Sequence, residues 1–418
     1  MSLKVLMFGW ELAPIVYGGL GVVCRSITER LIQSNIRVTY VIPKLPVSID
    51  IPNLNLVNAS EIVLDERMFN KLSINSTLTP YVNNESYTQF VNFLRKNHIG
   101  EQDSDVYGMD LFTEVERYSY RSRDIVKSTE FDVIHCHDWM TFKAGVFAKQ
   151  ITGKPLVVHV HATEYDRSAG NPNPAVLDYE RFGLENADKI IAVSNFTKDK
   201  IVENYKIDPS KIAVVHNAIE KNITTSPVRS DMTKRIDEKM VLFLGRLTIA
   251  KGADYLLKAA QKVISVIPEA KFVFVGKGEM IKELIDMSIE LEISENIVFT
   301  GWLNHEQVDQ AYKQADLFVM PSITEPFGLT ALEAMRNGTP VLLSRQSGVS
   351  EVVQNCLKVD FWDIDAMANK ILSVLRYLPL QETLRENGNH DVDHLSWESQ
   401  TNKIIDLYNE LIINEHKG

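Results

Sequence analysis

Short apolar runs alternate with helix-forming segments along this chain, and the alternation starts twice. The first series of predicted strands covers residues 5–9, 38–43, 131–135, 155–161, 189–194 and 211–216. The second covers residues 240–245, 271–276, 296–300, 317–320 and 340–343. Strands that alternate with helices predict parallel sheets covered on both faces. The predicted fold class is therefore α/β, with two doubly wound Rossmann-like domains and a deep cleft between them.

The boundary between the two domains is predicted within a polar stretch. Residues 221–238 are rich in Thr, Ser and charged residues and show no apolar periodicity, so we interpret them as a linker. We place one domain at residues 1–220 and the other at residues 239–395. Residues 396–418 form an amphipathic helix pattern. Residues 47–130 give no reliable order of elements.

The composition excludes several classes of function. A chain of 418 residues is too long for one ordinary core, and its net charge of −11 argues against nucleic acid or anionic lipid as a partner. Cys24, Cys136 and Cys356 are far apart, which disfavours disulfides and structural zinc. No apolar stretch approaches the roughly 20 residues of a membrane span, and the chain begins directly with a strand pattern. We expect a cytoplasmic protein without an integral membrane segment; the sequence does not fix its oligomeric state.

The segment E-P-F-G-L-T-A-L-E contains two carboxylates placed around a predicted helix start. Glu325 lies on the loop after the strand at residues 317–320, and Glu333 lies about one turn inside the next helix. The N–H groups near Gly328 and Leu329 lie between them and would attract phosphate. The carboxylates could be a solvated helix face, but they are eight residues apart and Glu325 precedes the helix. One diphosphate and two diols would suit this segment, which indicates a nucleotide-sugar site.

A second motif, G-R-L-T-I-A-K-G, follows the first strand of the second domain. Arg246 offers a planar fork and Lys251 a compact charge, and together they could surround a diphosphate. For the pair alone, two solvated surface cations would be the better explanation. Their position before a helix in an acidic protein favours the diphosphate. Gly276, at the end of the next strand, could let a nucleobase lie on backbone.

Gly18 and Gly19 follow the first strand and would let a substrate approach the backbone. An ordinary turn explains them equally well, and the spacing is not that of a dinucleotide fingerprint.

Two H-x-H pairs raise the question of a metal site. His135 and His137 lie on or near one predicted strand, and His159 and His161 lie on or near the next. No further ligand spacing follows, so we predict no metal. We expect His161, at a strand's carboxyl end, to donate a hydrogen bond to the substrate, and His135 and His159 to be structural.

These motifs together, and in this order, resemble the retaining glycosyltransferases of the GT-B fold, namely family 4 and the neighbouring glycogen and starch synthases. The resemblance covers the whole chain. It is carried by E-x7-E at residues 325–333, G-R-x4-K-G at residues 245–252, the amino-terminal G-G-L-G, H-C-H-D-W at residues 135–139, H-A-T at residues 161–163 and the closing S-W-E at residues 396–398. One position departs, because Val16 stands where glycogen synthases usually have lysine.

The resemblance implies a role for each matching residue. It implies a donor site of Gly18, Gly19, Arg246, Lys251, Gly276, Glu325, Phe327, Gly328, Leu329 and Glu333. Within it, Arg246 and Lys251 would hold the diphosphate, Glu333 the ribose and Glu325 the transferred sugar. His161, Arg246, Lys251 and Glu325 would be catalytic, with His161 near the reacting carbon. Asp138 and Trp139 would lie on the acceptor side, in an acceptor-binding first domain. The last helix would pack back on that domain.

The function implied is metal-independent transfer of a hexose, glucose foremost, from a nucleotide diphosphate sugar to an α-glucan, with retention of configuration. No cofactor is implied beyond the donor substrate, ADP- or UDP-glucose. One alternative is a family-4 enzyme acting on a lipid, cell-envelope or small-molecule acceptor. Another, from a different class, is a catalytically silent sugar-nucleotide or glucan-binding protein.

Overall fold

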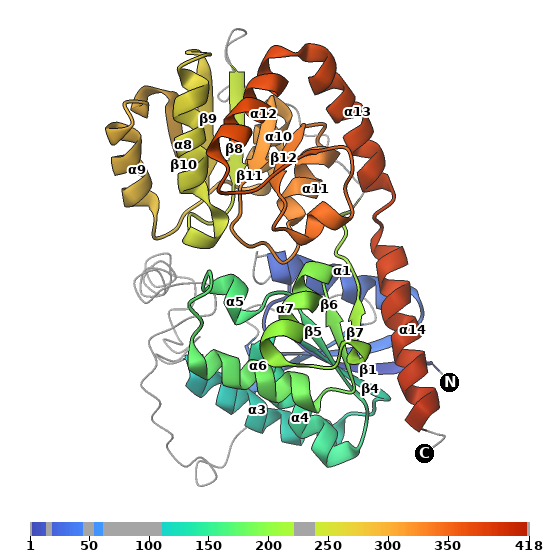
Figure 1. Ribbon diagram of the computed structural model, residues 1–418. Coiled ribbons are helices and arrows are strands. Elements are labelled where there is room, and N and C mark those ends of the chain that lie inside the picture. The colour runs from blue at the N-terminus through green and yellow to red at the C-terminus, as the bar shows by residue number, and fades with distance from the viewer. Residues whose placement is uncertain (1, 14–18, 45–53, 62–110, 221–238, 416–418) are drawn as a thin grey trace. The chain divides into compact units, whose positions relative to one another are not determined.

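The computed structural model describes residues 2–13, 19–44, 54–61, 111–220 and 239–415 (Figure 1). The chain divides into two compact units. Unit 1 comprises Met1–Val193, Thr197–His216 and Trp397–Gly418, and unit 2 comprises Ser194–Phe196 and Asn217–Ser396. The predicted linker, together with Gly18 and Val16, lies outside the described residues.

Unit 1 is built on a parallel sheet of seven strands in the order β3-β2-β1-β4-β5-β6-β7. The strands are β1 (Lys4–Phe8), β2 (Arg37–Ile42), β3 (Leu54–Asn58), β4 (Val133–His137), β5 (Leu156–Val160), β6 (Lys189–Ala192) and β7 (Ile212–Val214). Its helices include α1 (Gly19–Gln33), α3 (Leu111–Ser128), α4 (Trp139–Thr152), α5 (Glu164–Arg167), α6 (Pro174–Asn186), α7 (Asn195–Tyr205) and α14 (Trp397–Glu415). Every residue of β4 and β5 is buried, as expected for central strands of a parallel sheet, and three of these buried residues are histidines.

Adjacent residues of β4 show which helices cover each face of this sheet. A Cβ on Gly145 of α4 would lie 2.2 Å from Sγ of Cys136, so α4 packs closely on the face to which Cys136 points. The side chain of His135 points to the other face, where its Nδ1 contacts the hydroxyl of Tyr408 on α14. Helix α14, the last helix of the chain, therefore packs on the sheet of unit 1.

Unit 2 is built on a parallel sheet of six strands in the order β10-β9-β8-β11-β12-β13. The strands are β8 (Lys239–Leu244), β9 (Ala270–Val275), β10 (Ile297–Gly301), β11 (Leu317–Met320), β12 (Val341–Ser344) and β13 (Leu357–Val359). The helices are α8 (Ala253–Ile264), α9 (Ile281–Glu290), α10 (His305–Gln314), α11 (Leu329–Arg336), α12 (Ile364–Arg376) and α13 (Leu378–Asp393). Core residues such as Phe272, Phe274 and Leu342 have no exposed surface.

The prediction of two doubly wound α/β sheets is confirmed, and the predicted cleft stays a prediction. The sequence did not predict β3 or β13. Strand β13 has three residues, too few for a periodic pattern, and β3 lies in the stretch for which no order was predicted. Among the described residues, no helix is long and apolar enough to cross a membrane.

Candidate active site

The carboxyl ends of β8 and β11 mark the point in unit 2 where strand order reverses. From β8 the chain adds β9 and β10 on one side, and it then returns to place β11 on the other side. In doubly wound sheets, ligands bind at this switch point. The G-R-x4-K-G motif follows β8 and the E-x7-E motif follows β11, so the topology alone brings the two motifs together.

Backbone contacts hold the two loops against each other. The N–H of Ile323 donates to the carbonyl of Ala250 at 2.9 Å. Gly252 has φ of +66°, and a Cβ there would lie 2.1 Å from the carbonyl oxygen of Pro321. A residue with a side chain at this position would force the loops apart. Both the close packing of the loops and the positive φ therefore require glycine at position 252.

This packing places Lys251 beside Glu325. The Nζ of Lys251 lies 2.5 Å from an Oε of Glu325, and the side chains are 24% and 11% exposed. The hydroxyl of Ser322 also donates to that carboxylate, at 3.3 Å. The structure therefore joins one residue of each motif in a largely buried ion pair.

Helix α11 begins immediately after this pair. Gly328 precedes it with φ of +109°, and Leu329 is its first residue. The segment is fixed from the β12 side, because Val349 N–H donates to the carbonyl of Phe327 at 2.7 Å. The Phe327 side chain is only 3% exposed, so it belongs to the core and only its backbone can serve a ligand. The first N–H groups of α11 point out along the helix axis at this edge of the sheet.

Glu333 lies one turn inside α11 and is held by a residue that sequence reasoning missed. The hydroxyl of Tyr312 on α10 donates to an Oε of Glu333 at 3.1 Å. Tyr312 has no exposed surface. Burial raises the pKa of Glu333, and the charge of Arg336 opposes that rise. A tyrosine in a helix pattern carries no sequence signal for such a contact.

Two further predicted donor residues lie in the neighbouring loops. Arg246 follows β8 and is exposed. Gly276 has φ of +135°, and a Cβ there would lie 1.9 Å from the carbonyl oxygen of Gly245. Close packing of the loops after β8 and β9 therefore requires glycine at position 276, whatever that loop binds.

In unit 1, four histidine rings lie together on one face of the sheet. We call His135, His137, His159 and His161 the histidine stack. Neighbouring rings have centroids 4.2 to 5.4 Å apart. His135, His137 and His159 are at most 1% exposed. Burial is the main cause that lowers the pKa of each of these three imidazoles well below the usual value.

The geometry of His161 differs from the expectation. Its Nε2 lies 3.0 Å from Nδ1 of His137. Its Nδ1 is buried and has no hydrogen-bond partner among the described residues. Burial lowers the pKa of His161 to about 3, so the ring is neutral. The Nε2 of His161 is therefore occupied by the contact with His137, and its Nδ1 is buried, so neither nitrogen is available to solvent. The strand spacing used in the prediction could not reveal this contact.

The ring geometry also bears on the metal question. Ring nitrogens of His135, His137 and His159 lie within 4.8 Å of one another, and so do ligand atoms of Cys24, His137 and His161. However, His135 and His137 stack at 4.5 Å and 24°, and His159 and His161 at 4.2 Å and 22°. Imidazole lone pairs lie in the ring plane, so stacked rings do not aim at one point about 2.0–2.1 Å from each nitrogen. We assign no metal to the stack.

Asp138 and Trp139 have structural roles that the sequence prediction did not give them. Asp138, at φ of 58°, is 1% exposed, and its carboxylate accepts the N–H of His161 at 2.7 Å. Trp139 is also 1% exposed and packs on Phe112 and Tyr179. We therefore leave Trp139 out of the acceptor site and assign Asp138 to holding the turn at His161. Trp139 was predicted from its motif alone, which carries no information about burial.

Gly19 begins helix α1, and a Cβ there would meet no atom within 4 Å. Packing among the described residues does not require glycine at this position, so a role in ligand approach stays a prediction beside an ordinary turn.

A buried polar network that the sequence analysis missed fixes the turn after His161. Arg167 donates to the carbonyl of Ala162 at 2.8 Å and pairs with Glu180. Thr163 and Asp166 form a capping box at the start of α5. Burial raises the pKa of Glu180 to about 7, although the Arg167 charge opposes it. The T-x-x-D spacing was a sequence signal for the box.

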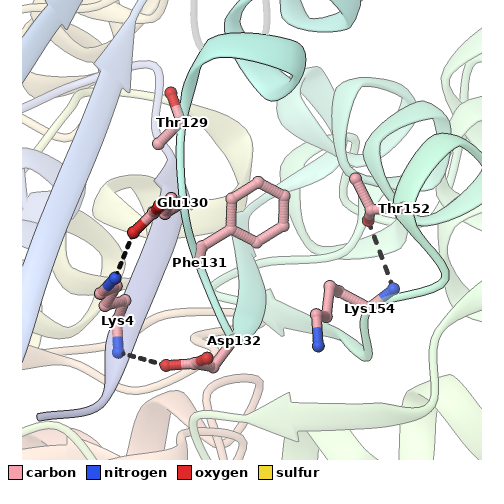
Figure 2. A pocket seen from close by; sticks show the side chains of 7 residues that line it. All are labelled: Lys4, Thr129, Glu130, Phe131, Asp132, Thr152 and Lys154. Atoms are coloured by element: carbon pink, nitrogen blue, oxygen red, sulfur yellow. Dashed lines mark hydrogen bonds and ion pairs between the residues drawn. The ribbon is translucent and has the colours of Figure 1, made fainter. Parts of the chain in front are cut away.

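A pocket of about 310 Å³ lies at the amino ends of β1 and β4 in the unit 1 sheet. Figure 2 shows Lys4 between Glu130 and Asp132, both of which it contacts. Ligands of doubly wound sheets bind at the carboxyl ends of strands, so we do not assign the candidate site to this pocket.

Comparison with known proteins identifies the class of enzyme. Residues 226–391 match the family described as Glycosyl transferases group 1, and residues 108–222 match Glycosyltransferase Family 4. The chain therefore carries group 1 and family 4 glycosyltransferase domains.

Several relatives are similar over different shares of the chain. An uncharacterized glycosyltransferase of Methanocaldococcus jannaschii is 29% identical over 97% of this chain and 98% of its own length. The UDP-Gal:alpha-D-GlcNAc-diphosphoundecaprenol alpha-1,3-galactosyltransferase of Escherichia coli is 26% identical over 70% of this chain and 78% of its own length. The D-inositol 3-phosphate glycosyltransferase of Mycobacteroides abscessus is 29% identical over 53% of each protein.

Solved structures share the fold. Sucrose-phosphate synthase from Thermosynechococcus elongatus superposes with a TM-score of 0.75 at 20% identity, over 99% of this chain and all of that one. Anabaena HepE, solved in complex with UDP and glucose, superposes with a TM-score of 0.68 at 18% identity, over 98% of this chain and all of that one. At these identities the similarity establishes the GT-B fold alone.

Proposed function

We propose that this glycosyltransferase transfers a hexose from a nucleoside diphosphate sugar bound at the carboxyl ends of β8 and β11. The observation that carries the proposal is the buried Lys251–Glu325 pair beside the start of α11. A cation and a helix start suit a diphosphate, and a carboxylate suits sugar hydroxyls. Glu333, one turn further on, takes the ribose.

The residues act on charge that develops as the sugar leaves. Departure of the nucleoside diphosphate builds negative charge on its oxygens. Lys251, Arg246 and the N–H groups at Gly328 and Leu329 stabilise that charge, and preorganised donors of this kind are worth on the order of 10²–10³ in rate each. The family resemblance supports retention of configuration. Because none of the described side chains at this site is an evident covalent nucleophile, we propose attack from the face that the leaving group vacates.

For the acceptor we propose an α-glucan with UDP- or ADP-glucose as donor. The support is the likeness of residues 135–139 and 161–163 to glycogen synthase segments. A second candidate is a lipid-linked or small phosphorylated acceptor, favoured by the names of two relatives. The presence of Arg246, Lys251 and both motif glutamates argues against a catalytically silent relative, which would usually have lost some of them.

One assay separates these acceptors. The protein is incubated with ADP-, UDP- or GDP-glucose, alone and with glycogen, D-inositol 3-phosphate or an undecaprenyl-linked sugar, and nucleoside diphosphate release is followed. Release that requires glycogen supports the glucan, and release that requires another acceptor replaces it with that one. Absence of release with every donor and acceptor would contradict glucosyl transfer, and the configuration of the product tests retention.

We expect Glu333→Ala to weaken nucleoside diphosphate binding roughly 10- to 100-fold, because a charged acceptor of ribose hydroxyl bonds is lost. Tyr312→Phe removes only the hydroxyl that orients Glu333 and should weaken binding less. Calorimetric titration with the preferred nucleotide measures both. Unchanged affinity in Glu333→Ala would show that Glu333 does not bind the ribose.

We expect transfer to persist in excess EDTA. Arg246, Lys251 and a helix start stabilise the charge on the leaving diphosphate, so a divalent cation is not required. Initial rates with and without chelator measure this. Complete loss of rate that Mg²⁺ or Mn²⁺ restores would overturn the expectation.

A further inference from the structure

The ion pair between Lys251 and Glu325 joins two groups to which the proposed function gives different ligands. Lys251 serves the diphosphate, and Glu325 serves the sugar. In the structure the two charges neutralise each other at 2.5 Å. Each of these side chains therefore already has a partner, which a ligand has to replace.

The surroundings hold Glu325 more firmly than Lys251. The Glu325 N–H donates to the carbonyl of Gln346 at 3.0 Å, and its own carbonyl accepts from Gly348 at 3.0 Å. Its carboxylate accepts from Ser322. Lys251 is the more exposed partner, and its long side chain has rotatable bonds. A bound anion can draw the ammonium away, whereas Glu325 stays in place.

We propose that Glu325 competes with the diphosphate for Lys251, so that the diphosphate and sugar subsites are coupled. This inference rests on the proposed function. A diphosphate that engages Lys251 leaves Glu325 a buried carboxylate without its cation, and such a group is costly. Sugar hydroxyls offer hydrogen bonds to that carboxylate. The intact nucleotide sugar satisfies both residues, whereas the nucleoside diphosphate product satisfies only one.

The coupling has a consequence for turnover. Once the sugar has left, Glu325 recovers Lys251 and weakens the hold on the remaining diphosphate. The pair thus favours the substrate over the product, and product release is part of its role. A carboxylate that serves only as a sugar ligand would have no effect on the affinity for a nucleoside diphosphate.

The test is a titration of wild type and Glu325→Gln with ADP, UDP or GDP, whichever binds wild type most tightly, and with its glucose conjugate. Glutamine keeps the size of the side chain and can still accept from Ser322, but it holds Lys251 less strongly. We expect the nucleoside diphosphate to bind roughly 10-fold more tightly to Glu325→Gln. The conjugate should bind no more tightly than before, and transfer should fall. Glu325→Ala should shift nucleoside diphosphate affinity in the same direction, which covers a folding failure of either variant.

Glu279→Gln is the matched control. It removes one negative charge from the exposed loop after β9, at the same edge of the sheet but outside the pair. A similar gain in that variant would show a general electrostatic effect and would overturn the inference. Unchanged or weaker nucleoside diphosphate binding in Glu325→Gln would also overturn it. If transfer still falls in that case, the proposed function stands without the coupling, whereas normal transfer would remove Glu325 from the sugar site as well.

Discussion

Lys251→Ala is expected to lower turnover at least roughly 100-fold, because it removes a preorganised cation from the leaving diphosphate. Arg246→Ala should have an effect of the same order. Initial rates with saturating donor, together with the ratio kcat/KM, measure both. Lys258→Ala on α8 is a control, since this lysine is partly exposed and pairs with Asp254 one turn away. Near-normal transfer in both Lys251→Ala and Arg246→Ala would show that the diphosphate does not bind at this site.

The loss in Lys251→Ala has a second possible cause that needs separating. Removing the ammonium leaves Glu325, only 8% exposed, as a buried charge without its partner, and breaking such a pair destabilises by about 3–5 kcal/mol. The double variant Lys251→Ala with Glu325→Gln removes the stranded charge. It should regain stability in urea unfolding and remain inactive. Recovery of activity in the double variant would show that the lysine serves folding alone.

The arrangement of the site in unit 2 follows from topology that the sequence could predict. Apolar runs at residues 240–245 and 317–320 are strong strand signals, and parallel strands leave their carboxyl ends at one edge. The motifs that carry Lys251 and Glu325 follow those two strands. Their proximity thus depends on strand order, which the doubly wound pattern predicts.

The contacts that sequence reasoning missed are those made by side chains from other elements. Tyr312 reaches Glu333 from a different helix, and His137 reaches His161 from the neighbouring strand. Such partners depend on side-chain direction and packing. The periodicity of a single sequence predicts strands and helices, but it does not show which side chains from different elements meet. The same limit explains Trp139, whose motif indicated the acceptor although its ring lies in the core.

A further large effect is expected from pH. We expect unit 1 to lose stability steeply as pH falls below 6.5. His135, His137 and His159 are buried and neutral, and their pKa values lie well below 6.5 in the folded protein. The unfolded chain takes up protons on these rings near pH 6.5, whereas the folded chain does not. Stability is therefore present above that pH and is lost as pH falls through the window below it.

The size of the effect follows from the number of rings. Each buried histidine contributes about 1.4 kcal/mol per pH unit once the unfolded ring is protonated. Glu180 acts in the opposite direction, because its pKa is raised to about 7 and the folded protein binds its proton first. His161, whose pKa burial lowers to about 3, is a fourth such ring. The net slope for unit 1 between pH 6 and 5 is then about 4 kcal/mol per pH unit, which is large against a total of roughly 5–15 kcal/mol.

Tryptophan fluorescence during urea unfolding can report on unit 1 separately. Trp10, Trp139 and Trp397 lie in unit 1 and are at most 6% exposed. Trp302 and Trp362 lie in unit 2 and are 67% and 58% exposed, so their environment changes little on unfolding. The urea midpoint of the fluorescence transition, measured from pH 8 to pH 5, therefore follows the stability of unit 1.

His159→Leu tests whether the stack causes the slope. Both ring nitrogens of His159 are buried and have no hydrogen-bond partner among the described residues, so leucine of similar size should cost little at pH 8. The slope should fall by about 1.4 kcal/mol per pH unit, because one ring no longer takes up a proton on unfolding. His390→Leu, at an exposed position of α13, should leave the slope unchanged. An equally steep slope in His159→Leu, or a shallow one in wild type, would mean that the stack accepts protons in the folded protein.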